Sequence, residues 1–204
     1  SVERHRIRSS RLTWSRKFTM KEAILTAPCD EPGGRVVRSV YSMDLTVENL
    51  KRFWELSKPF KYLFNKEISN DFKTFCELFL YEGKGGLQSN GLFWVVDDFV
   101  GIFYMDNIRH GVSRLEADVH YTFFDRRHRG RTELVREMVK YLFRKYNFQR
   151  LNAEIPLYAK KGTFEFATAV GFRREGRRRK AQWHNDDWFD VLEFGILKDE
   201  ALKS

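Results

Sequence analysis

The spacing of hydrophobic residues along this chain switches between a period of two and a period near 3.6. Apolar runs and alternation predict strands at residues 35–44, 92–96, 99–104, 114–124, 150–155 and 188–197, the second and third forming a tight hairpin around Asp97–Asp98. Apolar residues three and four apart predict helices after Thr46, from Asp71 to the glycines at 83–86, from Gly130 to Tyr146, and over 158–170. This order of elements is typical of an α/β or α+β domain.

The first part of the chain shows no such periodicity. Residues 1–34 are rich in basic residues and close with Pro28, Pro32 and Gly33–Gly34. We therefore predict a basic, loosely structured N-terminal extension over 1–34 and one folded domain over 35–200. Because Met20 follows the most basic part, residues 1–19 could precede a natural start at that methionine.

Composition limits the class of protein. The chain has 204 residues, of which 42% are hydrophobic and 16% aromatic, as expected of a globular domain rather than a disordered chain. No apolar run approaches the roughly 20 residues that a membrane-spanning helix needs. Cys29 and Cys76 lack metal-binding spacing, so we expect neither a metal site nor a disulfide framework. Together these features favour the reducing cytoplasm.

The positive charge of the chain is concentrated in two clusters. The formal net charge is +9, and basic residues crowd positions 1–21 and 173–180. Such clusters bind nucleic acid, an acidic protein surface or a nucleotide-containing ligand, or they are solvated charges without a dedicated partner. The composition leaves these alternatives open.

A basic turn between a strand and a helix is the strongest candidate for a ligand site. Residues 126–132 read Arg-Arg-His-Arg-Gly-Arg-Thr, and they join the strand that ends at Phe124 to the next helix. Backbone N–H groups at such a turn attract anions together with the helix dipole, and a glycine lets the backbone approach a phosphate closely. The alternative is a basic surface loop that only caps the helix.

Four segments in this order resemble the GNAT family of acetyl-CoA-dependent N-acetyltransferases. Arg127–Thr132 is similar to the family's Arg/Gln-x-x-Gly-x-Gly/Ala signature, and Val95–Gly101 looks like its central hairpin. Ala169–Gly176 resembles the family's last helix-to-strand step, and Trp183–Val191 resembles the C-terminal region of the branch that acetylates ribosomal-protein N-termini. The resemblance implies a central mixed, mostly antiparallel, twisted sheet with splayed middle strands and flanking helices. It also implies acetyl-CoA as cosubstrate.

The resemblance indicates which residues hold acetyl-CoA. They are the strand end, the basic turn and one threonine of the following helix: Phe123, Phe124, Arg127, Arg129, Gly130, Arg131, Thr132 and Thr163. Two positions depart from the family's pattern. Lys160 stands where many members have an asparagine that touches the cofactor, and Ala167 stands where many have the tyrosine that protonates the CoA thiolate.

Three residues are candidates for proton transfer. Glu116 and His120 share one face of the predicted strand, where the family commonly places a base. Glu116 is the first choice and His120 the second, because an imidazole titrates near neutral pH. Tyr158, just after the 150–155 strand, is the nearest substitute for the missing acid. The alternative is that the charged residues of this face only pair with one another.

These inferences predict an N-acetyltransferase in which a primary amine attacks the thioester directly. The expected acceptor is a protein N-terminus or a lysine, with Asp186, Asp187 and Asp190 holding the cationic amine. The alternative is a weakly active or inactive GNAT-fold protein whose basic clusters contact nucleic acid, the ribosome or another large assembly, including one of phage origin. We expect no membrane partner.

Overall fold

One eight-stranded sheet organises the fold of this protein. The computed structural model describes residues 22–31, 34–110, 115–125 and 130–203. The elements are β1 (Leu25–Glu31), β2 (Gly34–Ser42), α1 (Val47–Ser57), α2 (Lys66–Asn70), α3 (Phe72–Glu77), β3 (Leu80–Gly83), β4 (Gly86–Ser89), β5 (Leu92–Val96), β6 (Gly101–His110), β7 (Leu115–Phe123), α4 (Arg131–Tyr146), β8 (Arg150–Pro156), α5 (Lys161–Val170), β9 (Arg173–His184), β10 (Asp187–Leu197) and α6 (Lys198–Lys203). The strand order is β1-β2-β5-β6-β7-β8-β10-β9, and β3 and β4 form a separate hairpin.

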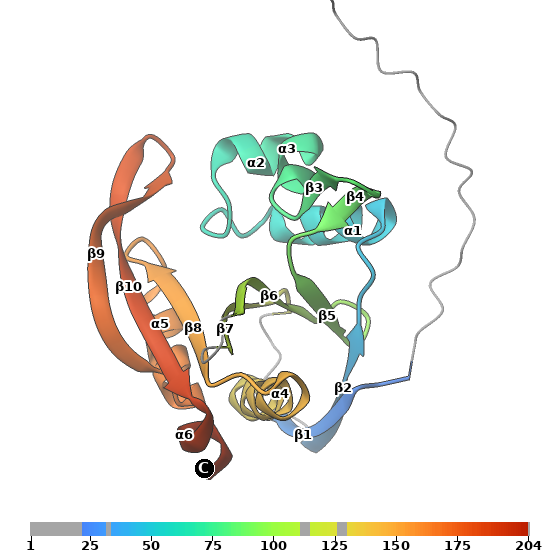
Figure 1. Cartoon of the computed structure of the whole chain (residues 1–204), viewed down its shortest axis with the longest axis vertical. Helices are drawn as coiled ribbons and strands as arrows, with labels where there is room; N and C mark the ends of the chain where they lie inside the picture. Colours follow the sequence, from blue (N-terminus) through green and yellow to red (C-terminus); the bar gives the residue numbers. More distant parts are fainter. Residues whose placement is uncertain (1–21, 32–33, 111–114, 126–129, 204) are drawn as a thin grey trace, which may run out of the picture.

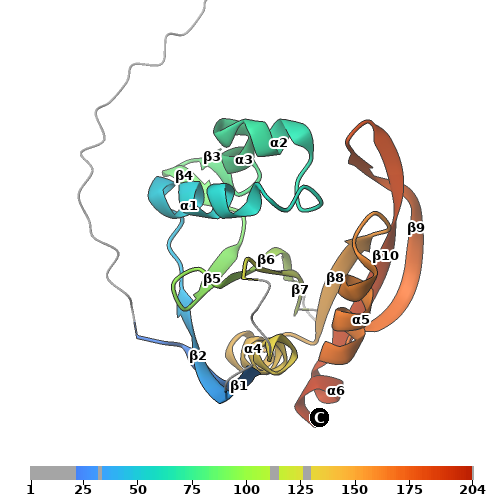
Figure 2. The same cartoon turned by 180° about the vertical axis from the view of Figure 1, so that it is seen from behind.

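The sheet separates two hydrophobic cores. Figure 1 shows α1, α2 and α3 with the β3–β4 hairpin on one side of the central strands and α4 on the other, and Figure 2 shows the same division from behind. The core under α4 is largely aliphatic and includes Ala117 and Val119 of β7. The core under α1 and α3 is aromatic, with Phe53 and Phe75 buried at its centre. None of the described helices is long and apolar enough to cross a bilayer.

The helix starts follow local side-chain signals. Thr46 caps α1, because its hydroxyl accepts the N–H of Asn49 at 3.1 Å. Asp71 caps α3 and accepts the N–H of Thr74 at 3.0 Å. The predicted end of this second helix is wrong: α3 stops at Glu77, and residues 80–83 pair with β4 instead. The glycines that were expected to end the helix lie in and beside the β3–β4 turn.

The expectation that all of residues 1–34 are loosely structured is also wrong. Residues 25–31 form β1, which pairs with β2 from Leu25↔Val40 to Glu31↔Gly34. Ala27 and Cys29 are each 1% exposed and belong to the core under α4. Pro28 is tolerated because β1 is an edge strand and one of its sides has no ladder to complete. Residues 1–21 lie outside the described residues.

The two middle strands diverge after a short paired stretch. β7 and β8 are the one parallel pair in the sheet, and they pair only at Glu116↔Arg150, Ala117↔Leu151 and Asp118↔Asn152. β7 then continues to Phe123 along β6, while β8 continues along β10. The antiparallel, mixed sheet with splayed middle strands and flanking helices is therefore confirmed.

Candidate active site

Main-chain groups of β7 face the opening between β7 and β8. The N–H of Phe124 donates to the carbonyl of Val100 at 2.9 Å, on the β6 side. Since successive residues of a strand direct their main-chain groups to opposite edges, those of Tyr121 and Phe123 are directed toward the β8 side, past the last β7–β8 pair at Asp118↔Asn152, where β8 has turned away. Of the two phenylalanines predicted to contact CoA, Phe123 directs its main-chain groups toward the opening. The N–H of Phe124 is bonded to β6 and is not available to a ligand.

The start of α4 borders the same opening. Gly130 is the N-cap of α4, and no side chain caps the N–H groups of its first turn, which contains Arg131 and Thr132. The guanidinium of Arg131 lies 5.8 Å from the ring centroid of Phe123. Unsatisfied N–H groups and a neighbouring arginine suit a phosphate-bearing ligand. Arg127 and Arg129 lie outside the described residues.

Helix α5 forms another side of the opening. Phe166 packs against Tyr121, with ring centroids 5.3 Å apart, and Thr163 lies one turn earlier on the same helix. Lys160 is the N-cap of α5 and makes no side-chain cap. Ala167, which stands at the family's tyrosine position, is completely buried. The residues around the opening therefore fit the elongated arm and phosphates of CoA, without the usual tyrosine.

Gly130 has a structural role of its own. Its φ is +72°, in the left-handed region, and a Cβ built on it would lie 2.5 Å from Cβ and 2.8 Å from Cα of Cys29. Strand β1 therefore passes directly against the turn. Glycine is required here by backbone conformation and by this close approach, whether or not it also makes room for a phosphate.

A pocket of about 230 Å³ lies on the other face of β6 and β7, below α2 and the aromatic core. Apolar and aromatic side chains line it together with polar groups, and Asp106 is the one carboxylate among its described lining residues. The lining residues are Leu63, Phe64, Asn65, Ile68, Leu78, Phe79, Tyr104, Asp106, Tyr158, Gln182 and His184. The pocket joins residues from four parts of the chain that are far apart in sequence.

His120 lies beside this pocket and at the opening. Its Nε2 is 3.1 Å from Oδ1 of Asp106, and its ring stacks on Tyr104 with centroids 4.2 Å apart. Because a carboxylate can only accept, Nε2 is the ring nitrogen that carries a proton in this contact. Burial raises the pKa of the Tyr104 phenol. His120 follows the last β7–β8 pair, at Asp118, by two residues, so it lies where the strands have separated.

Glu116 lies at the closed end of the same strand. Its carboxylate accepts from Arg109 at 3.1 Å, and it is in register with Arg150, where β7 and β8 are still paired. Between Glu116 and His120, Asp118 is buried and accepts from two asparagine amides, Asn107 at 2.9 Å and Asn152 at 3.2 Å. The carboxylates of Glu116 and Asp118 are therefore paired near the closed end, while His120 lies next to the β7–β8 opening and the pocket.

Tyr158 lines the same pocket as Asp106. Its ring stacks on His184 with centroids 4.0 Å apart, and burial raises the pKa of its phenol. The phenol is therefore protonated at neutral pH and able to donate. Sequence reasoning missed Asp106 and His184 as site residues, because their partners His120 and Tyr158 lie far from them in sequence. Asp106 is in register with Asp118 in the pairing of β6 with β7, which was not predicted from the sequence.

The three aspartates near the C-terminus lie elsewhere. Asp186 pairs with Lys66 at 3.4 Å, and Asp190 pairs with Arg177. Asp187 accepts the N–H of Trp188 at 2.7 Å. These carboxylates are engaged with nearby donors, and Asp106 is the acid that lines the pocket.

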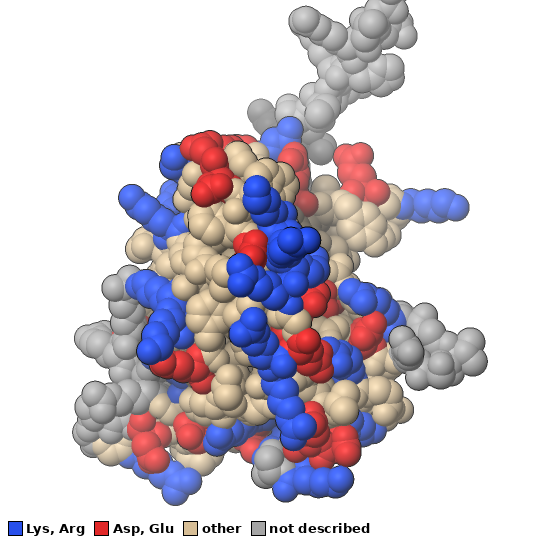
Figure 3. Space-filling model, turned by 90° about the vertical axis from the view of Figure 1, so that its left-hand side faces the viewer, with Lys and Arg blue, Asp and Glu red and all other residues tan. Residues whose placement is uncertain are grey.

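The basic cluster at 173–180 forms most of the edge strand β9. Figure 3 shows its Lys and Arg side chains in a band down the face made by β9 and β10, with acidic side chains between them. Arg173 pairs with Glu200 at 2.9 Å, and Arg178 pairs with Glu193 at 3.0 Å. Much of this positive charge is therefore compensated locally.

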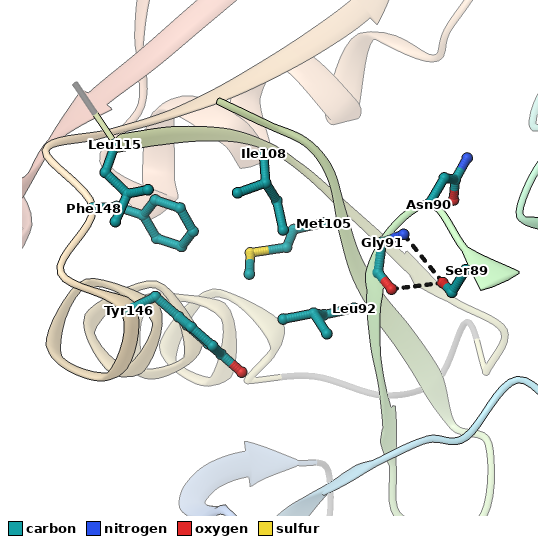
Figure 4. A pocket seen from close by; sticks show the side chains of 9 residues that line it. All are labelled: Ser89, Asn90, Gly91, Leu92, Met105, Ile108, Leu115, Tyr146 and Phe148. Carbon is teal, nitrogen blue, oxygen red and sulfur yellow. Dashed lines mark hydrogen bonds between the residues drawn. The ribbon is translucent and has the colours of Figure 1, made fainter. Parts of the chain in front are cut away.

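A second pocket lies elsewhere in the described structure. It has a volume of about 370 Å³, and Figure 4 shows Leu92, Met105, Ile108 and Phe148 pointing into it beside Tyr146, near the C-terminal end of α4. Its described lining residues include no acid and no imidazole. It therefore lacks groups for proton transfer, unlike the smaller pocket beside His120.

Comparisons with known proteins agree with this geometry. A protein-family model described as an acetyltransferase (GNAT) domain matches residues 88–192, just over half of the chain. Mycobacterium smegmatis RimJ in complex with CoA-disulfide is similar, with a TM-score of 0.64 and 18% identity over 86% of this chain and 88% of that one. The Vibrio fischeri ribosomal-protein-S5-alanine acetyltransferase has a TM-score of 0.60 and 15% identity, over 79% and 93%.

A third neighbour acts on a different amine. Vibrio cholerae spermidine N-acetyltransferase, in complex with CoA and spermine, has a TM-score of 0.63 and 17% identity over 81% of this chain and 98% of that one. No curated protein matches the chain. The family match covers β5 to β10, which include the β7–β8 opening, the basic turn and the residues around His120. The resemblance inferred from the motifs is thus confirmed, and this chain belongs to the GNAT family of acetyltransferases, whose acetyl donor is acetyl-CoA.

Proposed function

We propose that this acetyltransferase acts on a primary amine of a protein or peptide, an N-terminus or a lysine, that enters the pocket beside His120. The observation that carries the proposal is the position of the Asp106–His120 pair, next to both the β7–β8 opening and the pocket. Acetyl-CoA supplies the acetyl group in activated thioester form. The chain supplies a base, an acid, polarising N–H groups and a binding site for the amine.

His120 is the base in this proposal. Asp106 holds the proton on Nε2, so Nδ1 is the atom that takes the proton of the incoming ammonium or amine. Glu116 was the first choice from sequence, but its pairing with Arg109 and its place at the closed end favour His120.

Tyr158 is the proposed proton donor, replacing the tyrosine that is absent at Ala167. Its raised phenol pKa keeps the proton available at neutral pH, and it lines the same pocket as Asp106. The N–H of Tyr121, which follows His120 and is directed toward the opening, is suited to polarise a carbonyl oxygen there. Arg131, Thr132 and Thr163, with Arg127 and Arg129, remain the proposed CoA contacts.

The pocket walls favour a peptide amine over a polyamine. A polyamine carries several positive charges, and each one that leaves water needs an acidic partner. The pocket has one described carboxylate, Asp106, among apolar walls such as Phe64, Ile68 and Phe79. This combination suits a single amine next to an apolar side chain.

The test compares His120→Gln with Glu116→Gln in acetyl transfer to a panel of peptides, spermidine and aminoglycosides. We expect His120→Gln to lower kcat by about 10²- to 10⁴-fold, the usual contribution of a general base, and Glu116→Gln to stay close to the wild-type rate. Wild-type rates in both variants would exclude both bases. Rapid turnover of spermidine with no peptide acetylated would overturn the proposed acceptor.

A further inference from the structure

His184 lies where two distant parts of the chain meet over the acceptor pocket. It ends β9 and is only 7% exposed. Figure 1 shows the tip of the β9–β10 hairpin rising beside α2, and the N–H of Lys66, the first residue of α2, donates to Oδ1 of Asn185 in that tip at 3.1 Å. Pocket residues 63–65 lie on one side of this junction, and Gln182 and His184 lie on the other.

The hydrogen bonds at this junction assign the protonation state of His184. Because Lys66 donates to Oδ1 of Asn185, the amide Nδ2 is the group that faces Nε2 of His184, at 2.8 Å. Nδ2 is a donor, so Nε2 must accept and carries no proton. The contact of the imidazole with the backbone of Lys61 raises the pKa of the ring. A contact of that sign is one in which a ring N–H donates to the carbonyl of Lys61. The ring is therefore neutral, with its proton on Nδ1.

We propose that His184 is a positioning residue: its neutral Nδ1–H form fastens the hairpin tip to residues 61–66 and thereby sets the shape of the acceptor pocket and the orientation of Tyr158. This inference rests on the proposed function, because it assumes that the acceptor amine enters this pocket. The stacking of Tyr158 on His184, at 4.0 Å, links the fastening to the proposed proton donor.

Protonation would break this arrangement. A proton on Nε2 would oppose the N–H groups of Asn185, and rotating that amide would bring its NH₂ against the N–H of Lys66. Burial lowers the pKa of His184 from its ordinary 6.5, more than the bond to Lys61 raises it. The neutral form is thus retained at neutral pH, and its contribution is present above pH 6.5 and lost as pH falls through the lowered pKa.

Other charged and titratable groups surround the ring on each side. Asp186 and Lys66 form an ion pair across the same junction, and Tyr158 covers one face of the ring. Asp106 lines the pocket, and Lys61 offers its main-chain carbonyl. The Asp186–Lys66 pair is exposed and weak, so it cannot replace the buried bonds of His184.

Nuclear magnetic resonance of the imidazole nitrogens tests the assignment directly. Long-range ¹H–¹⁵N spectra of the whole chain, with the signal of His184 identified by its loss in His184→Phe, should show a neutral ring protonated at Nδ1 at neutral pH. A proton on Nε2, or a charged ring at neutral pH, would overturn the inference. This result does not depend on which amine is the acceptor, so it is separate from a failure of the proposed function.

Three variants test the role in acceptor binding. His184→Phe keeps the stacking but removes both hydrogen bonds, and we expect KM for the best peptide to rise about tenfold with KM for acetyl-CoA unchanged. We expect the peptide KM of wild type to rise below pH 6.5, as His184 becomes protonated. Asn185→Asp lets a charged His184 donate to a carboxylate, so this rise should disappear in that variant. Trp188→Phe, at an exposed position of the same hairpin, is the control and should match wild type. Unchanged peptide KM in His184→Phe, or equal acid-side increases in wild type and Asn185→Asp, would contradict the proposal.

Discussion

Replacing Gly130 by alanine probes the contact between the basic turn and β1. The substitution forces an L-residue to adopt φ +72° and places a Cβ 2.5 Å from Cβ of Cys29, 2.8 Å from its Cα and 3.0 Å from the main-chain nitrogen of Asp30. Two of these three neighbours are backbone atoms, so rotation of the cysteine side chain cannot relieve the contact. Cys29→Ala is not expected to rescue the variant, because the Cβ stays in place.

Two costs add in this variant. A left-handed backbone conformation costs an L-residue about 1–2 kcal/mol, and overpacking a close-packed site costs about 1–3 kcal/mol. The expected loss in the free energy of unfolding is therefore about 2–5 kcal/mol. For a chain of this size, each kcal/mol lowers Tm by roughly 2–4 °C. Urea denaturation followed by fluorescence measures the loss.

Gly162→Ala provides the matched control. Gly162 lies in the first turn of α5, and a Cβ there meets nothing within 4 Å. Alanine should be neutral or stabilise the protein by about 0.5–1 kcal/mol, because it lowers the entropy of the unfolded chain. If Gly130→Ala loses less than about 1 kcal/mol, below the lower bound of the left-handed cost alone, the close approach of β1 is refuted. A loss of CoA affinity without a loss of stability would instead assign Gly130 to the phosphate site alone.

Two further predictions concern the reaction itself. Arg131→Gln should weaken CoA binding about 10- to 100-fold at low salt, because one charge-assisted contact is lost. Calorimetric titration should also show a shallower salt dependence of the affinity than in wild type. Lys73→Gln, on the distant α3, should change neither quantity, and an unchanged affinity in Arg131→Gln would remove this arginine from the site. Tyr158→Phe keeps the stack on His184 but removes the phenol proton, so we expect kcat to fall at least about tenfold with the peptide KM unchanged; a kcat equal to wild type would exclude Tyr158 as the acid.

The elements with a strong local period could be predicted from the sequence. Helix α4 carries its apolar residues on one face, and the β5–β6 hairpin is marked by two apolar runs around an acidic pair. Their stability comes from contacts that the local pattern already indicates. Strand β1 has no such pattern, because its pairing with β2 and its packing on α4 are non-local and because Pro28 suggests a loop.

The arginine-rich stretch 173–180 shows a similar limit. By composition it is a charge cluster, yet it forms the long strand β9, because carboxylates on neighbouring strands lie opposite its arginines. Arg178, for example, is paired with Glu193 of β10 at 3.0 Å. Cross-strand pairing of this kind depends on the register of β9 against β10, which no local signal in 173–180 specifies.

Part of the candidate site could be predicted from the sequence, and part could not. The basic turn was predicted because its chemistry is continuous in sequence, whereas the acceptor pocket was not, because Asp106, Tyr158 and His184 come from three different strands or their ends. Only the order β6-β7-β8-β10-β9 brings these residues together. The sequence pattern suggested His120 as a base. Its partner Asp106 could be identified only from the pairing of β6 with β7 in the sheet.

The alternation of strand β7 explains why donor and acceptor sites can meet at one residue. Along β7, the main-chain groups of Tyr121 and Phe123 are directed toward the opening that β8 leaves, while the side chain of His120, the residue before Tyr121, lies on the face of the proposed acceptor pocket. A strand paired on both sides would have those N–H groups bonded within the sheet. Because β7 and β8 separate just after Asp118, the same short segment offers polarising N–H groups to one ligand and a base to the other. The position of the divergence is therefore the main structural ground for proposing His120 rather than Glu116 as the base.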